Sequence, residues 1–168
     1  MEANDFLTTK QQKEIVNAII DRCRRYKSLE EQFDSLFYKP YTKMREKHLL
    51  TSAVLSAFSP MELSIDGIKS NDIYYGLNNN LSQPELICDR GIFHIYSDGS
   101  NLKGNRITEL SAKYNEDTMH TPVFFIIVFT ADNSCNLTKV ELCALDKNGS
   151  ITERIMIYES VNSLAVIA

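Results

Sequence analysis

Seven consecutive apolar residues, Val123 to Phe129, constrain the fold of this chain more than any other feature of the sequence. The run is far shorter than the roughly 20 residues that cross a membrane as a helix, and its Val, Ile and Phe residues favour a strand. Successive side chains of a strand point to opposite faces of its sheet. Because a sheet with one solvated face shows an alternation of apolar and polar residues, this run predicts a strand that is covered by protein on both faces.

The two covering layers are expected to come from other parts of the chain. The even-numbered residues Phe124, Ile126 and Val128 form one face of the strand, and we expect the N-terminal helices to cover it. The odd-numbered face then needs a second layer, for which the candidates are a helix at residues 107–114, the apolar tail at 161–168 and another subunit. If no segment of the chain covers that face, the protein binds a copy of itself or a partner there.

The first 58 residues have the three- and four-residue apolar spacing of amphipathic helices. A first helix is predicted over residues 10–26. Ser28 and Glu31 have the spacing of a capping box, which predicts that a second helix begins there and runs over residues 28–38. A third helix is predicted from residue 42 or 43 to residue 58.

From residue 61 onward the apolar period changes to two, and Gly, Pro and Asn residues mark turns. The pattern predicts a half-buried strand over residues 61–65, a short strand at 73–75, a loop over 78–84, a hairpin over 85–96, a helix over 105–115 and three closing strands at 123–130, 137–145 and 151–158. Asn148-Gly149 joins the last two strands and is expected to supply the positive φ angles of a tight hairpin turn. The three closing strands are therefore predicted to form an antiparallel meander.

Together these elements predict an α+β fold, in which an N-terminal helical segment of about three helices packs on a mainly antiparallel β-sheet that ends in a three-strand meander. At 168 residues the chain is expected to form a single domain, with a helical portion at 1–60 and a β-rich portion at 61–168. Its first residues lack the pattern of a signal peptide. The expected location is therefore the cytoplasm, without a membrane partner.

Common catalytic and cofactor-binding motifs are missing from the sequence. It contains no GxGxxG or P-loop motif for phosphates, and neither GxSxG nor HExxH for hydrolysis. Among the three histidines, His94 lies between apolar residues of a predicted strand, where a structural role is expected. Cys23, Cys88, Cys135 and Cys143 form no CxxC pair and are expected to be buried, reduced thiols. We therefore predict no cofactor, no metal site and no catalytic residue.

One group of residues indicates a metal-dependent nuclease as an alternative function. In one common nuclease arrangement, carboxylates on neighbouring strands hold Mg²⁺ against the phosphate, and a lysine two positions from one of them orients the attacking water. Lys139 and Glu141 share a face of a predicted strand, as residues i and i+2 do, and Asp89 or Asp98 lies upstream. The order of the lysine and the glutamate is the reverse of the usual order.

A second alternative is a nucleic-acid-binding module. Arg22, Arg24, Arg25 and Lys27 cluster around Tyr26, where they could contact phosphates beside a stacking ring. The same cations also complement the negative end of the first predicted helix. Residues 1–50 hold 10 Lys or Arg against 8 Asp or Glu, whereas the whole chain has a net charge of -4, which opposes bulk binding of nucleic acid.

The leading interpretation is a non-catalytic cytoplasmic protein that acts by binding a macromolecule. The two-sided apolar strand and the apolar C-terminus favour a protein partner or a second copy of the chain, as in a homodimer. The uncovered face expected on the strand at 123–129 is the physical basis of this interpretation.

Overall fold

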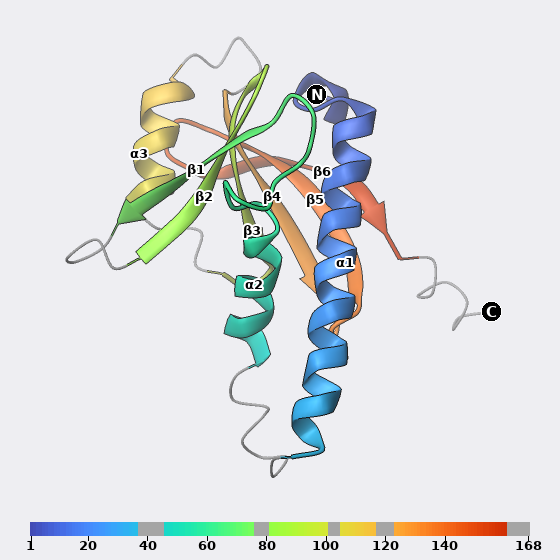
Figure 1. Cartoon of the computed structure of the whole chain (residues 1–168). Coiled ribbons are helices and arrows are strands. Elements are labelled where there is room, and N and C mark those ends of the chain that lie inside the picture. The colour runs from blue at the N-terminus through green and yellow to red at the C-terminus, as the bar shows by residue number, and fades with distance from the viewer. Residues whose placement is uncertain (37–45, 76–80, 101–104, 117–122, 161–168) are drawn as a thin grey trace.

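Figure 1 shows the computed structural model of the protein, which describes residues 1–36, 46–75, 81–100, 105–116 and 123–160. Its elements, in chain order, are a short 3-10 helix η1 (Ala3–Asp5), α1 (Thr9–Asp34), α2 (Glu46–Ser56), β1 (Lys69–Tyr75), β2 (Leu81–Cys88), β3 (Gly91–Ser97), α3 (Asn105–Tyr114), β4 (Phe124–Ala131), β5 (Leu137–Leu145) and β6 (Ile151–Glu159). In the part of the chain that the structure describes, no helix combines the length and apolarity that crossing a membrane requires.

The six strands form one sheet in the order β1-β2-β3-β4-β5-β6. Neighbouring strands are antiparallel except β3 and β4, which are parallel and are connected through α3. A parallel pair needs such a crossover, because a tight turn can join only antiparallel strands. The predicted α+β fold, its mainly antiparallel sheet and the closing meander β4–β6 are confirmed.

Both faces of β4 are buried within the chain, and the layers are the reverse of those predicted. Helices α1 and α2 cover the odd-numbered face, where Phe125 and Phe129 pack in the main core with Ile15 and Ile19. The predicted helix at 107–114, present as α3, covers the even-numbered face through Ile107 and its neighbours. The residue period of β4 does not specify which layer goes to which face, because both faces are equally apolar.

Burial of this strand contributes strongly to the stability of the fold. Every residue from Phe124 to Phe129 is at most 2% exposed, and full burial of one such side chain contributes about 1.5–3 kcal/mol. The residue after α3, Asn115, fixes the helix to the strand. Its side-chain amide donates to the carbonyl oxygen of Phe124 at 2.8 Å and accepts from the Phe124 amide at 2.9 Å. Helix α3 is therefore positioned by polar as well as apolar contacts.

The predicted first and second helices are one continuous helix, α1, of 26 residues. Its N-cap is Thr8, whose side chain accepts a hydrogen bond from the Gln11 amide at 3.1 Å. The capping box expected at Ser28 does not form, because no Gly or Pro interrupts the helical hydrogen bonds between residues 26 and 29. The second half of the helix therefore continues in the direction of the first and extends past the ends of β4 and β5 (Figure 1).

Two predictions for the segment after α2 are wrong. Residues 61–65 form a turn and an irregular segment rather than a strand, and the amides of Glu62 and Leu63 both donate to the carbonyl oxygen of Ser59. Strand β2 begins at Leu81, so residues 81–84 belong to a strand and not to a loop. Pro84 is paired with Asp72 of β1, but no residue of β3 is paired with it, because β2 pairs with β3 only at residues 86–88. A proline is tolerated where one side of its strand is unpaired.

The turn between β5 and β6 also differs from its prediction. Only Gly149 has a positive φ, at 81°, whereas Asn148 does not. The amide of Gly149 donates to the carbonyl oxygen of Asp146 at 3.1 Å, which is the pattern of a longer hairpin loop with a glycine bulge. The β4–β5 turn has the same hydrogen bonds, with Cys135 at φ 61° in the position equivalent to Gly149.

Candidate functional site

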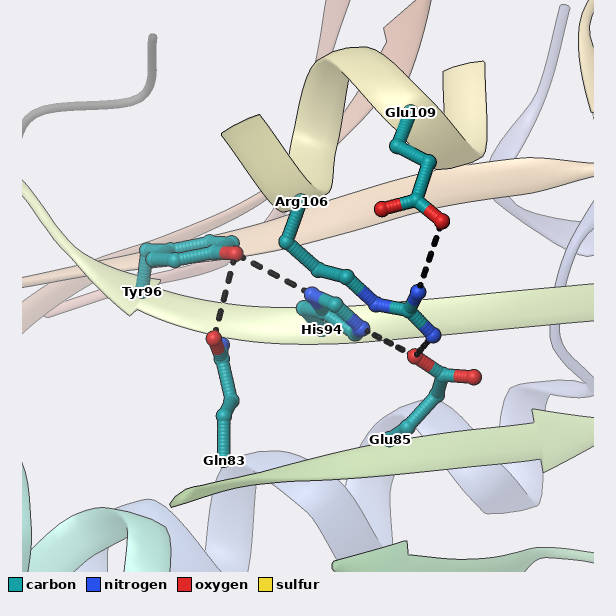
Figure 2. A network of polar contacts seen from close by, with 6 residues as sticks. All are labelled: Gln83, Glu85, His94, Tyr96, Arg106 and Glu109. Carbon is teal, nitrogen blue, oxygen red and sulfur yellow. Dashed lines mark hydrogen bonds and ion pairs between the residues drawn. The ribbon is translucent and has the colours of Figure 1, made fainter. Parts of the chain in front are cut away.

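A network of polar side chains lies between the sheet and α3 (Figure 2). Its centre is His94 of β3, whose side chain is 1% exposed. The Nε2 atom of His94 lies 3.0 Å from Oε2 of Glu85 on β2, and its Nδ1 atom lies 3.0 Å from the hydroxyl oxygen of Tyr96. Tyr96 in turn contacts Oε1 of Gln83 at 3.3 Å. Both nitrogens of the imidazole therefore have partners, as expected for a structural histidine.

Helix α3 joins the network through its first turn. The Nη2 atom of Arg106 donates to Oε2 of Glu85 at 3.0 Å, and Nη1 lies 3.4 Å from Oε1 of Glu109. The hydrogen bond from His94 lowers the pKa of the Glu85 carboxyl below its usual value; burial opposes this effect and the contact with Arg106 adds to it. Glu85 is therefore an ionised carboxylate that connects the β2–β3 hairpin to α3.

The polar side chains of this network form hydrogen bonds with one another. A tyrosine hydroxyl has one proton, so Tyr96 donates either to Gln83 or to His94, and the orientation of the Gln83 amide decides which. Oε2 of Glu85 accepts from both His94 and Arg106. A general base needs a lone pair within hydrogen-bond reach of a substrate. The His94 ring is buried, and both of its nitrogens are hydrogen-bonded within the network. The network therefore has a structural role, and its contact with Arg106 holds α3 on the sheet.

The sequence contained a signal for part of this network. In the predicted hairpin, Leu86 pairs with Phe93 and Ile87 with Ile92. Extending this register by one residue places Glu85 beside His94, and by three residues places Gln83 beside Tyr96. The contribution of Arg106 had no such signal, because it depends on where α3 packs.

The four residues of the nuclease alternative are brought together only in part. Lys139 and Glu141 lie on one face of β5 with Nζ and Oε1 3.3 Å apart, and Arg154 of β6 contacts the same glutamate oxygen at 3.2 Å. Asp89 and Asp98 lie before and after β3, whose seven residues span about 20 Å of extended chain. Glu141 is thus paired with two cations, and the two aspartates lie at opposite ends of a strand.

No group of three or more His, Cys, Asp or Glu side chains in the described residues is arranged to hold a metal ion. A Mg²⁺ site needs carboxylates that converge on one point. The nuclease interpretation stays a prediction of the sequence.

The four basic residues of the nucleic-acid alternative point in different directions around α1. Arg22 faces α2, where it donates to Ser56 at 3.0 Å, and it lies 3.5 Å from Glu62. Arg25 pairs with Asp21 one turn earlier at 3.6 Å. Lys27 and Arg24 lie toward the β4–β5 turn, where Lys27 contacts Asn136 at 3.4 Å and Arg24 lines a pocket. These residues therefore do not form one continuous basic face.

All four cysteines belong to the described residues, are buried, and form no disulfide. Burial raises the pKa of the Cys23 and Cys143 thiols to about 11 and also raises the pKa of Cys88. These thiols are neutral near neutral pH, as the sequence predicted for structural cysteines.

Among the described residues, four exposed apolar side chains lie where α1 and α2 extend past the sheet (Figure 1). Leu29 is 53% exposed, Phe33 38%, Leu36 79%, and Leu49 of α2 47%. Figure 1 shows that α1 and α2 run antiparallel. Leu29 and Leu49 each lie seven residues from the contact between Arg22 and Ser56, which places them at the same level along the two helices. We call these four residues the distal apolar patch.

In comparisons with known proteins, no family model, no curated protein and no solved structure matches this chain.

Proposed function

We propose that the protein acts without catalysis, by binding a protein partner or a second copy of itself through the distal apolar patch. The observation that carries this proposal is the exposure of Leu29, Leu36 and Leu49 together at one end of the α1–α2 pair. Exposed clusters of large apolar side chains are typical of interaction surfaces. The face of β4 that was expected to need a partner does not support this proposal, because α1 and α2 cover one face of β4 and α3 covers the other.

The remaining surfaces of the sheet support this choice. Strand β6 is an edge strand that pairs only with β5. Thr152 and Ile157 have no partner in the β5–β6 register, so β6 contains two bulges. Strand β1, at the other edge, has exposed Lys69 and Asp72. Bulges and charges are the means by which natural sheets prevent pairing of their edge strands with other chains. The helices, rather than the sheet edges, are therefore the proposed binding surface.

The chemistry of the thiols supports a reducing compartment for this function. Four buried cysteines without a disulfide are typical of proteins kept under reducing conditions. We therefore place the proposed interaction in the cytoplasm.

Photo-crosslinking tests the proposal directly. The photoreactive residue p-benzoylphenylalanine is incorporated in place of Gln32, an exposed position of α1 between Leu29 and Leu36, and adducts formed in living cells are identified by mass spectrometry. The matched control carries the same residue in place of Met61, which is 95% exposed and lies outside the patch. The proposal expects adducts from position 32 only.

A second variant separates binding from incidental contact. Leu29→Gln with Leu36→Gln removes apolar area from the patch and is expected to abolish the adducts formed at position 32. An adduct of twice the chain mass identifies self-association, and any other protein adduct identifies a partner. Equal adduct yields from positions 32 and 61, or adducts that survive the double substitution, would exclude the distal apolar patch as the binding surface.

A further inference from the structure

A pocket of about 430 Å³ lies between α1, the β4–β5 turn and the end of β6. Its apolar wall includes Ile20 and Cys23 of α1, Leu137 of β5 and Tyr158 of β6. Pockets that bind small molecules usually measure about 300–1,000 Å³, with mostly apolar walls and a few polar groups that orient the ligand. The volume of this pocket lies in that range, and its lining combines apolar side chains with an equal number of polar residues.

Arg24 is the polar group that distinguishes this pocket. Arg22, Arg25 and Lys27 each contact a neighbouring side chain. Among the described residues, Arg24 makes no ion pair and no hydrogen bond through its side chain, although it lines the pocket. A guanidinium group presents up to five N–H donors in a planar fork, and those of Arg24 are available to a ligand.

The lining of the pocket also includes the carboxylate of Asp132, which accepts hydrogen bonds from the β4–β5 turn. Its Oδ1 atom accepts from the amides of Ser134 at 2.8 Å and Asn136 at 2.9 Å, and its Oδ2 atom accepts from the Asn136 side chain at 3.2 Å. Partial burial opposes ionisation of Asp132, but these hydrogen bonds hold its pKa below the usual value. The Asp132 carboxylate thus accepts the hydrogen bonds that close the β4–β5 turn.

We propose that this pocket binds a small organic carboxylate, with its charged group on Arg24 and its apolar body against Ile20, Leu137 and Tyr158. Carboxylates match the planar fork of a guanidinium and form two parallel hydrogen bonds with it. Lys27, which lies one turn from Arg24 and contacts Asn136, adds positive charge at the same side. Apolar side chains beside a single guanidinium group suit a monoanion with a hydrocarbon body.

The test is a titration of the isotope-labelled full chain, followed by NMR. The probe is phenylpropionate, and the matched probes are neutral phenylpropionamide and inorganic phosphate. We expect phenylpropionate to shift the amide signals of residues that line the pocket. Arg24→Gln is expected to weaken its affinity by about tenfold or more, as the loss of a charge-assisted hydrogen bond implies. Arg25→Gln is the matched control, since Arg25 lies on another face of α1 and pairs with Asp21.

Each outcome decides the proposal. Pocket shifts with phenylpropionate that need Arg24 and not Arg25 support it. Equal affinity for the amide, or an affinity unchanged by Arg24→Gln, overturns it. Binding of phosphate but not of phenylpropionate shows an anion site without a role for the apolar wall, and overturns the assignment to carboxylates. These outcomes are independent of the adducts formed at position 32, so the proposed function is tested separately.

Discussion

The Nε2 atom of His94 lies 3.0 Å from the Oε2 atom of Glu85, and this contact joins two neighbouring strands beneath α3. Because Arg106 reaches the same oxygen from the helix, one carboxylate holds a strand, its neighbour and the crossover helix together. The network thus supports the parallel β3–β4 connection, for which no tight turn is available.

Glu85→Gln is expected to lower the free energy of unfolding by about 2 kcal/mol near neutral pH. The substitution removes charge-assisted hydrogen bonds with His94, which is buried, and with Arg106, which is partly buried. Urea denaturation measures the change. Glu109→Gln is the control: Glu109 contacts the same arginine, but its side chain is 67% exposed, so a change below about 0.5 kcal/mol is expected.

The effect of Glu85 depends on pH. A carboxyl whose pKa is lowered on folding stabilises the protein fully above its unfolded pKa of about 4.3, and this stabilisation is lost as the pH falls through the lower pKa of the folded protein. The difference in stability between wild type and Glu85→Gln is therefore expected to be largest above about pH 5 and to shrink below about pH 4. A difference that stays constant across this range would contradict the role assigned to Glu85.

Gly91→Ala is expected to destabilise the protein by about 3 kcal/mol or more, the upper end of the cost of overpacking. A Cβ atom on Gly91 would overlap the backbone carbonyl group of Val123, next to the hydrogen bond of 2.8 Å from the Ile92 amide to the same carbonyl oxygen. Thermal and urea denaturation measure the loss.

Gly99→Ala is the matched control for this substitution. Gly99 has a φ of 85° and nothing within 4 Å of an added Cβ, so only backbone strain of about 1–2 kcal/mol is expected. Equal losses of stability in Gly91→Ala and Gly99→Ala would show that overlap with Val123 does not cause the loss at position 91.

Substitutions on opposite faces of β4 are both expected to destabilise the fold. Phe125→Ala opens the core beneath α1 and α2, and Ile126→Ala opens the smaller core beneath α3. Losses of about 3–5 and 2–5 kcal/mol are expected, respectively, in urea denaturation. Met156→Ala on β6, where the side chain is 47% exposed, should change the stability by less than about 0.5 kcal/mol. A negligible loss for Ile126→Ala would mean that α3 does not cover the even-numbered face in solution.

Cys23 and Cys143 are expected to resist thiol reagents in the folded protein. With pKa values raised to about 11, about one thiol in a thousand is ionised near pH 8, and only the thiolate reacts. Labelling with iodoacetamide, followed by peptide mass spectrometry, should modify both residues slowly under native conditions and rapidly after denaturation. Rapid native labelling of either residue would show that its side chain reaches solvent.

The sequence correctly predicted the elements whose signals are local. The apolar run at 123–129 and the turn residues after it specify the meander, because strand period and turn chemistry act over a few neighbouring residues. The hairpin at 85–96 and the helix at 105–115 were predicted for the same reason. The strand predicted at 61–65 was wrong because five residues of alternation are too few to outweigh a turn that contains Ser59 and Pro60.

The tertiary structure alone decided how these elements meet. A strand with two equally apolar faces does not specify which helix covers which face, so the exchange of layers around β4 followed from packing alone. Likewise, the continuity of α1 through Ser28 was decided by unbroken backbone hydrogen bonds rather than by a capping pair in the sequence. The contact of Arg106 with Glu85 joins residues 21 positions apart. Periodicity carries information over one or two turns of chain, whereas contacts at that separation depend on where α3 settles on the sheet.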